Sequence, residues 1–215
     1  MYKAIIFDLD GTLLNTSRDI CKVLNDALAK FGCPQVSLQK TLEYVGNGAK
    51  KLVERAVPQG FDRTEQLYEY YRVNFAACDN DLTCLYDGEG EFLRNIKACG
   101  IKTAILTNKP DDAAQSVCKK FLAPFGFDCI VGQTGRFPLK PDPSAALYIM
   151  DRLGVEKAGC LFVGDGETDI ATAKNAGIDC ASVLWGFRTR EQLLAAGAQM
   201  FARDYKELER IALGN

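Results

Sequence analysis

The 215-residue sequence contains no histidine, and this absence removes several classes of enzyme. Ser-His-Asp catalysis, Cys-His catalysis and histidine-ligated zinc sites are excluded, because each of them requires an imidazole. The side chain that most often acts as a general base near pH 7 is missing as well. Any acid–base chemistry must therefore come from carboxylates, lysine, tyrosine or cysteine.

Features that mark nucleic-acid-binding, membrane or secreted proteins are also scarce. No long basic run is present, and 26 Lys and Arg residues nearly balance 28 Asp and Glu residues, so the composition does not support a nucleic-acid-binding face. No apolar stretch approaches the ~20 residues that cross a bilayer. The first apolar run, residues 4–7, is too short for the core of a signal peptide. We therefore expect a cytoplasmic protein with no nucleic-acid and no membrane partner.

The nine cysteines are scattered, and no two of them have the C-x-x-C spacing of a redox or metal motif. Their odd number and the absence of a secretory signal argue against a disulfide framework. We interpret them as small apolar residues. With 47% hydrophobic and 25% charged residues, the chain has the composition of an ordinary globular protein.

What the sequence does contain is an alternation of short apolar runs with segments of helical length. The apolar runs lie at residues 3–9, 102–106, 129–131, 160–163 and 181–184. The helical segments lie at about 88–99, 111–122, 142–153 and 168–176, and two more, at 191–196 and 205–213, are expected to cover the sheet edge. Strands that alternate with helices predict a parallel sheet with helices on both faces. We therefore expect an α/β fold with a Rossmann-like core.

A stretch after the first predicted strand interrupts this alternation with helical patterns. Apolar residues follow Ser17, a plausible N-cap, at helical spacing as far as Gly32. The same spacing recurs around Leu52 and around Tyr71, which predicts two more helices. Such an insertion is too long for a loop, so we expect a small all-helical domain. The expected boundaries are 15–81 for this helical domain and 1–14 with 82–215 for the core domain.

Residues suited to binding or catalysis follow the first four predicted strands. In chain order these are Asp8, Asp10, Gly11 and Thr12; then Thr107, Asn108 and Lys109; then Lys140; then Asp165, Glu167 and Asp169. Because ligands bind at the carboxyl ends of parallel strands, we expect these residues to converge on one site. Carboxylates this crowded repel one another, and a divalent cation relieves that repulsion. Mg²⁺ takes oxygen ligands and leaves room for phosphate, and a lysine beside a hydroxyl suits a phosphate dianion.

In order and spacing, these residues resemble the four motifs of the haloacid dehalogenase superfamily of phosphohydrolases. The matching segments are residues 8–13, 106–108, 140–141 and 164–169. Four motifs in order, each after a predicted strand, are a far more specific signal than one motif. The helical insertion between the first and second motifs resembles the helical cap of that superfamily. Residues 45–56 and 100–110 are similar to the corresponding parts of bacterial phosphoglycolate phosphatases.

The resemblance implies a role for each matching residue. Asp8 is expected to be the nucleophile that forms an aspartyl-phosphate, and Asp10 the general acid and then the general base. The residues expected to bind the phosphoryl group are Gly11, Thr107, Asn108 and Lys140. The expected Mg²⁺ ligands are Asp8, the backbone carbonyl of Asp10, Asp165 and Asp169. In the cap, the residues expected to contact the substrate are Gly46, Asn47 and Lys50.

Together these matches imply a Mg²⁺-dependent phosphatase that acts on a small phosphorylated metabolite, similar to phosphoglycolate phosphatase, as a monomer or a dimer. Asp10 argues against dehalogenases and phosphonoacetaldehyde hydrolases, which lack that aspartate. The missing cap histidine disfavours a sugar phosphomutase. A pyrophosphatase, or a sugar-phosphate phosphatase or phosphomutase of the same capped type, stays open, and so does an inactive homologue that only binds a small molecule. Asn15 and Gly166 depart from the residues that relatives often carry, which bears on the subfamily.

Overall fold

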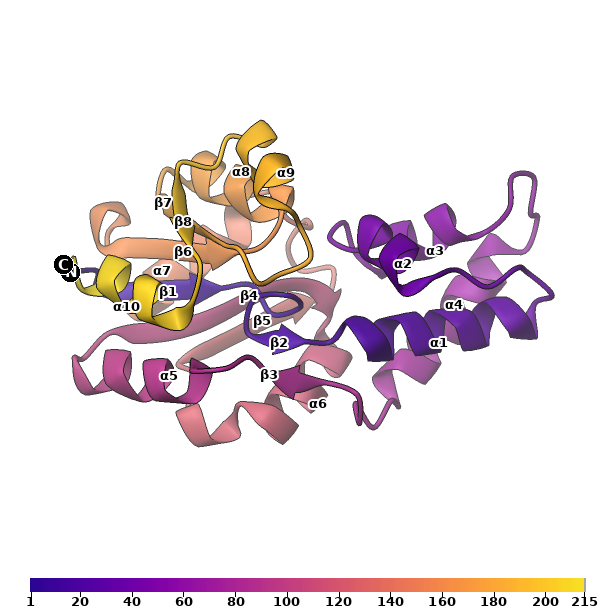
Figure 1. Ribbon diagram of the computed structural model, residues 1–215, viewed down its shortest axis with the longest axis horizontal. Helices are drawn as coiled ribbons and strands as arrows, with labels where there is room; N and C mark the ends of the chain where they lie inside the picture. The colour runs from indigo at the N-terminus through magenta and orange to yellow at the C-terminus, as the bar shows by residue number, and fades with distance from the viewer. Residues whose placement is uncertain (215) are drawn as a thin grey trace.

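The computed structural model describes residues 1–214 and contains a six-stranded parallel sheet with helices on both faces (Figure 1). Its strands are β1 (Ala4–Phe7), β4 (Lys102–Pro110), β5 (Cys129–Gln133), β6 (Cys160–Gly164), β7 (Asp179–Val183) and β8 (Met200–Ala202). They are arranged in the order β5-β4-β1-β6-β7-β8. The first strand therefore ends near the middle of the sheet, between β4 and β6. The predicted α/β class with a Rossmann-like sheet is confirmed.

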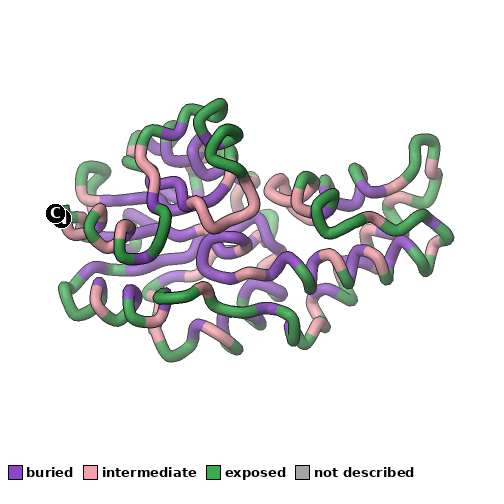
Figure 2. Tube along the Cα trace, in the orientation of Figure 1, coloured by how far each residue is buried: buried purple, intermediate pink, exposed green. Residues whose placement is uncertain are grey.

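The side chains of β1 alternate between two apolar clusters, as the period of two in a strand requires. Ile5 and Phe7 pack on the face covered by α5 (Glu89–Ala98), α6 (Asp111–Phe121) and α10 (Tyr205–Leu213). Ala4 and Ile6 pack on the face covered by α7 (Ser144–Leu153) and α8 (Glu167–Ala176). All four residues are fully buried, which suits a central parallel strand (Figure 2). The 3₁₀ turns η1 (Ala123–Phe125) and η2 (Lys157–Gly159) lie in the connecting loops.

The C-terminal region differs from the expectation in one respect. The helices α9 (Arg190–Ala195) and α10 form as predicted, but the segment between them forms β8, which pairs with β7 at the edge of the sheet. This region therefore extends the sheet, and α10 packs on a face rather than over the edge. Three residues are too few for an alternating pattern to be recognised in the sequence.

A helical insert, residues 17–76, extends from one end of the sheet (Figure 1). It consists of α1 (Ser17–Lys30), α2 (Leu38–Tyr44), α3 (Ala49–Ala56) and α4 (Thr64–Ala76). Three of these helices are the predicted ones, and α2 was missed because its one buried residue is Thr41, so it has no apolar stripe. Thr16, not Ser17, occupies the N-cap position of α1. The insert has its own apolar cluster, which includes Leu24, Leu52 and Tyr71.

Two short strands lead the chain into and out of the helical insert. The strands β2 (Leu14–Asn15) and β3 (Cys84–Leu85) pair in antiparallel fashion, so the two crossings lie side by side. Asp19 at the start of α1 holds the second crossing. Its Oδ2 atom accepts the Leu82 backbone N–H at 3.1 Å and the Thr83 hydroxyl at 2.7 Å.

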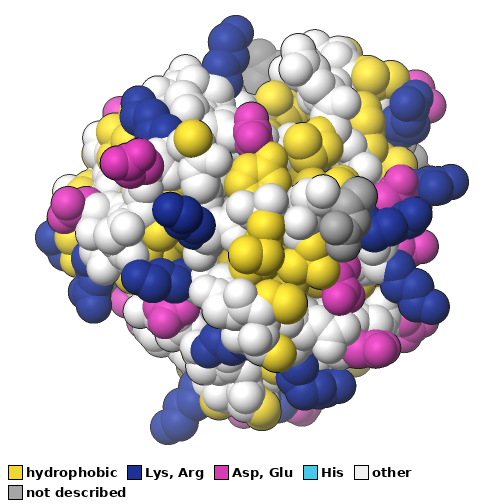
Figure 3. Space-filling model, turned by 90° about the vertical axis from the view of Figure 1, so that its left-hand side faces the viewer, with side chains coloured by type: hydrophobic (Ala, Val, Ile, Leu, Met, Phe, Trp, Pro, Cys, Tyr) yellow, Lys and Arg dark blue, Asp and Glu magenta, His cyan; other side chains and the backbone are white. Residues whose placement is uncertain are grey.

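The end of the molecule opposite the helical insert carries a mixed surface (Figure 3). Basic and acidic side chains alternate around this face, and neither sign forms a continuous patch. This pattern agrees with the nearly balanced charge of the sequence. None of the helices within residues 1–214 is both long enough and apolar enough to cross a membrane.

Candidate active site

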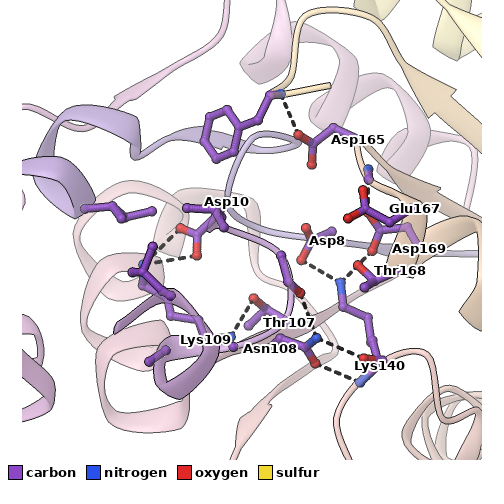
Figure 4. Close-up of a pocket in the computed structure, with 18 of the residues that line it drawn as sticks. Asp8, Asp10, Thr107, Asn108, Lys109, Lys140, Asp165, Glu167, Thr168 and Asp169 are labelled. Atoms are coloured by element: carbon purple, nitrogen blue, oxygen red, sulfur yellow. Dashed lines mark hydrogen bonds and ion pairs between the residues drawn. The ribbon is translucent and has the colours of Figure 1, made fainter. Parts of the chain in front are cut away.

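The carboxyl ends of the central strands bring most of the predicted residues into one pocket (Figure 4). The core side of the pocket is lined by Asp8, Asp10, Thr107, Asn108, Lys109, Lys140, Asp165, Glu167 and Asp169. The helical insert forms the opposite side, with residues such as Val45, Ala49 and Leu52. The cavity between these two sides has a volume of about 70 Å³. That volume holds about five water molecules, so the arrangement suits a small ligand.

Lys140 joins two of the acids at the centre of the pocket. Its Nζ atom lies 2.8 Å from Asp8 Oδ1 and 2.6 Å from Asp169 Oδ1, and its side chain is only 2% exposed. Burial alone would lower the pKa of Lys140, but the two carboxylates raise it above its usual value, so the ammonium group stays charged. Asp169 also accepts the Gly166 backbone N–H at 3.0 Å, at the positive end of the α8 dipole.

Asn108 positions the backbone on either side of this lysine. Its Oδ1 atom accepts the Lys140 N–H at 2.8 Å, and its Nδ2 atom donates to the Lys140 carbonyl at 3.1 Å. The same Nδ2 atom donates to the Gly46 carbonyl of the helical insert at 3.0 Å. Asn108 therefore links the lysine loop to the insert. The neighbouring Thr107 is buried in the pocket, and its hydroxyl oxygen accepts the Lys109 backbone N–H at 3.2 Å.

The carboxylate of Asp165 is held by two hydrogen bonds and packs closely against two glycines. Its Oδ2 atom accepts the Phe187 backbone N–H at 2.6 Å, and its Oδ1 atom accepts the Thr12 hydroxyl at 3.2 Å. A Cβ atom at Gly11 or at Gly186 would overlap with this carboxylate. Gly11 also has a φ of +92°, which other residues rarely adopt. The structure thus places Gly11 against Asp165, where its lack of a side chain lets the acid approach.

Three carboxylates form a compact oxygen cluster. Asp8, Asp165 and Asp169 each offer an oxygen, and these atoms lie within 4.8 Å of one another. Burial raises the pKa of Asp8 to about 7 against the opposing effect of Lys140, and Asp169 adds to the rise. Burial, then the charges of Asp8 and Asp169, raises the pKa of Asp165 to about 8. Crowded, buried carboxylates of this kind fit a hard divalent cation such as Mg²⁺, because its charge would offset their repulsion.

Asp10 points away from this cluster toward a second buried lysine. Lys109 Nζ lies 2.9 Å and 3.2 Å from the two Asp10 carboxylate oxygens, and the Thr16 hydroxyl donates to Asp10 Oδ1 at 2.7 Å. The Lys109 side chain is 2% exposed, and its ammonium lies 4.2 Å from the centre of the Phe75 ring in α4. Lys109 was expected at the site from its position after a predicted strand, but no role was predicted for it.

The helical insert contributes fewer of its predicted residues. Gly46 lines the pocket. Asn47 accepts a hydrogen bond from Arg55 Nη2 at 2.7 Å instead of facing the cavity. Lys50 pairs with Glu65 at 2.7 Å and is 53% exposed. Among the three predicted residues of the insert, only Gly46 is brought to the pocket.

The loop after β7 adds two residues that sequence reasoning did not assign. Phe187 lines the pocket and donates its N–H to Asp165. Arg188 also lines the pocket, and its Nε atom lies 3.0 Å from Glu167 Oε2. Burial alone would raise the pKa of Glu167, but its bond to Arg188 lowers it overall. No motif of the sequence marked this loop as part of the site.

Comparison with known proteins agrees with this geometry. The family model for haloacid dehalogenase-like hydrolases matches residues 5–183, and the chain belongs to this family. It is 33% identical over 192 residues to phosphoglycolate phosphatase 1 of Pseudomonas aeruginosa, covering 86% of this chain and 70% of that protein. It is 31% identical over 219 residues to the phosphoglycolate phosphatase of Mannheimia succiniciproducens, covering 98% of each.

Solved structures show the same similarity. A Lactobacillus delbrueckii subsp. bulgaricus protein, provisionally assigned as a phosphoglycolate phosphatase, superimposes with a TM-score of 0.93 at 27% identity, covering 100% of this chain and 99% of that one. A predicted phosphatase from Clostridium acetobutylicum gives a TM-score of 0.85 at 28% identity, with both chains fully covered. The sequence-based prediction of a phosphatase that resembles phosphoglycolate phosphatase is confirmed.

Proposed function

We propose that this protein hydrolyses a small, anionic phosphomonoester in a Mg²⁺-dependent reaction, and that 2-phosphoglycolate is its preferred substrate. The observation that carries the proposal is the cluster of Asp8, Asp165 and Asp169 around Lys140, facing a cavity of about 70 Å³. The choice of substrate is supported by the names of the similar proteins from Pseudomonas aeruginosa and Mannheimia succiniciproducens.

Asp8 is the proposed nucleophile. It follows the central strand β1, and its side chain is 13% exposed, toward the pocket. One carboxylate oxygen attacks phosphorus and forms an aspartyl-phosphate, and the bond from phosphorus to the alcohol oxygen breaks. Water then attacks phosphorus, which releases phosphate and restores the carboxylate. Lys140 lowers the repulsion between Asp8 and the phosphate, and Thr107 supplies a hydroxyl at the same wall.

Asp10 is the proposed acid and base for the two steps. It donates a proton to the departing alcohol oxygen and later accepts one from the attacking water. The structure supports this role by holding the Asp10 carboxylate from two directions. Lys109 and Thr16 bind it at 2.9 Å and 2.7 Å, so its orientation is set before the substrate arrives.

The proposed metal ligands are Asp8, Asp165, Asp169 and the backbone carbonyl of Asp10. When bound, Mg²⁺ supplies positive charge that offsets the charges of the carboxylates and of the phosphoryl group. The surrounding residues already hold one of these ligands, Asp165, in place. Gly11 and Gly186 make room for the Asp165 carboxylate, while the Phe187 N–H and the Thr12 hydroxyl fix its rotation.

We also propose that residues 15–81 act as a cap domain on a core formed by residues 1–14 and 82–215. The insert is held together by its own apolar cluster and forms the wall of the cavity opposite the acids, so we expect its movement to control how a substrate reaches Asp8. The paired strands β2 and β3 are the proposed hinge, because both connections to the insert pass through them.

The test is phosphate release from a panel of substrates, with Mg²⁺ and with EDTA. The panel contains 2-phosphoglycolate, pyrophosphate, sugar phosphates, nucleotides and p-nitrophenyl phosphate. We expect Mg²⁺-dependent release with a preference for 2-phosphoglycolate. A preference for pyrophosphate or a sugar phosphate would support the proposed phosphatase reaction but not 2-phosphoglycolate as its substrate. No release from any compound, with a melting temperature that still rises in Mg²⁺, would favour a non-catalytic binding protein.

A further inference from the structure

The loop that follows β7 runs from the candidate metal site to the helical insert (Figure 1). Its first part is fixed on the core, because Gly186 packs against Asp165 and the Phe187 N–H donates to that carboxylate at 2.6 Å. The next residue, Arg188, has a side chain that is 10% exposed and extends to the insert. The nearly buried guanidinium of Arg188 therefore starts from a backbone that is fixed on the core.

The Arg188 guanidinium makes three hydrogen bonds in three directions. Nη1 donates to the Leu42 carbonyl at 2.7 Å, Nη2 donates to the Val45 carbonyl at 2.6 Å, and Nε donates to Glu167 at 3.0 Å. The first two acceptors lie at the carboxyl end of α2, where carbonyls lack partners within the helix and the helix dipole is negative. The last turn of α2 contains no basic residue of its own. Arg188 therefore caps this helix from the core.

The segment held in this way is the part of the insert that closes the pocket. Gly46 and Gly48 follow directly and line the cavity, with φ values of +120° and +87°. Within the insert, Arg55 of α3 holds this segment by donating to the Tyr44 carbonyl at 2.9 Å and to Asn47 Oδ1 at 2.7 Å. These contacts fix its shape but do not tie it to the core. Its outside anchors are Arg188 at Val45 and Asn108 at the Gly46 carbonyl. These two core residues therefore hold the wall in place relative to the core, and with it the width of the cavity.

We propose that Arg188 determines substrate specificity by latching residues 42–48 of the helical insert onto the core, so that only small leaving groups fit beside the phosphate. This proposal rests on the phosphatase function proposed above. Arg188 is a positioning residue that acts through the backbone of the insert. A guanidinium suits the task, because its donors are spread over three nitrogen atoms and can reach two carbonyls and a carboxylate in different directions, whereas a lysine presents all its donors from one atom.

A second arginine provides a matched control at the same boundary. Arg72 of α4 lies 4.0 Å from Asp112 of α6, so it also faces the core from the insert side. Its side chain is 39% exposed and that of Asp112 is 54% exposed. Exposed pairs of this kind contribute little, so Arg72→Gln should leave the closed position of the insert unchanged.

The experiment compares Arg188→Gln, Arg188→Lys and Arg72→Gln by kcat/KM in Mg²⁺ with 2-phosphoglycolate and with p-nitrophenyl phosphate. The ratio of kcat/KM for 2-phosphoglycolate to kcat/KM for p-nitrophenyl phosphate measures the preference for a small leaving group. We expect Arg188→Gln to lower this ratio by about tenfold, which corresponds to the loss of one charge-assisted hydrogen bond. Most of the loss should appear as a higher KM for the small substrate. Arg188→Lys should recover part of the ratio, and Arg72→Gln should leave it unchanged.

Hydrogen exchange of the amides at 42–48, without substrate, gives a second readout that does not need turnover. Arg188→Gln should exchange faster there than the wild type, and Arg72→Gln should not. Equal losses for both substrates, or unchanged exchange in Arg188→Gln, would overturn the latch. If the wild-type protein hydrolyses neither substrate, the proposed function fails. The exchange experiment still tests the role of Arg188 in that case: faster exchange in Arg188→Gln supports it, and unchanged exchange contradicts it. If Arg188→Gln does not fold, Arg188→Lys decides by the same two readouts.

Discussion

The two walls of the pocket differ in their chemistry. The core wall contains most of the charge, with four aspartates beside two lysines, and both lysines are 2% exposed and paired with carboxylates. The wall formed by the helical insert consists of apolar side chains and backbone, including Val45, Ala49 and Leu52. A charged insert residue nearby, Lys50, turns to solvent. Every phosphate ester needs the same charges around phosphorus, whereas leaving groups differ in shape. The difference therefore supports the proposal that the core carries out the chemistry and the insert selects the substrate.

The largest effect should come from the core wall, at the proposed nucleophile. Asp8→Asn keeps the volume of the side chain but removes the attacking oxygen, so we expect kcat to fall by about 10⁴-fold or more. Steady-state turnover with Mg²⁺ and the preferred substrate measures the change. Thermal unfolding serves as the control, because the variant should remain folded. Near-normal turnover by a folded Asp8→Asn protein would remove the aspartyl-phosphate mechanism.

A smaller loss is expected when the support of Asp10 is removed. Lys109→Met keeps an unbranched apolar side chain beside Phe75 but loses the ion pair, so we expect kcat to fall by about 10- to 100-fold. The matched control is Lys120→Met, which removes an exposed pair with Asp81 at 2.9 Å and should leave kcat unchanged. Equal kcat values for Lys109→Met and the wild type would show that Asp10 acts without the support of the Lys109 ion pair.

Glu89 tests whether burial in the core is enough to raise the pKa of an acid. It is fully buried, one oxygen accepts the Tyr86 N–H at 3.2 Å, and burial raises its pKa to about 8. The folded state therefore holds a proton that the unfolded state releases near pH 4.3, and the free energy of unfolding should fall as the pH rises. We expect a loss of about 2 kcal/mol between pH 6 and pH 8 from this residue.

Urea unfolding of the wild type and of Glu89→Gln at pH 5, 6.5 and 8 measures this contribution. The raised pKa values of Asp8 and Asp165 affect both proteins alike, so the difference between the two curves isolates Glu89. The Gln variant should show the shallower dependence on pH. Identical slopes would mean that Glu89 is ionised in the folded protein and that burial alone does not explain the acids of the pocket.

The smallest effect is expected on the outside of the insert. Lys50→Gln removes an exposed pair with Glu65, and we expect kcat/KM for 2-phosphoglycolate to change by less than about twofold. The same kinetic assay measures it, with the wild type beside it. A tenfold rise in KM would show that Lys50 reaches the substrate in solution, and the insert wall would then contribute charge as well as shape.

The sequence predicted the parts of the fold whose signals are local. Runs such as Ala4–Phe7 identify buried strands, and apolar spacing identifies the longer helices of the insert. The strand β8 was missed because three residues show no alternation, and α2 was missed because it buries only Thr41 and has no apolar stripe. The acids and Lys140 were predicted from their positions after strands. The roles of Lys109 and Arg188 were not, because their contacts join residues 99 to 146 positions apart.

The side-by-side crossings β2 and β3 have a consequence for the folding of such a chain. Residues 16–83 connect β2 to β3, and because these two strands pair, the ends of this segment lie next to each other. For the folding of the sheet, the whole segment therefore acts as one loop. The entropy of closing a loop grows only with the logarithm of its length, about 0.6 kcal/mol for each doubling. The folding of the sheet is therefore nearly indifferent to the size of the inserted module. A longer or shorter module can therefore stand between β2 and β3 at little cost to the sheet that positions the carboxylates.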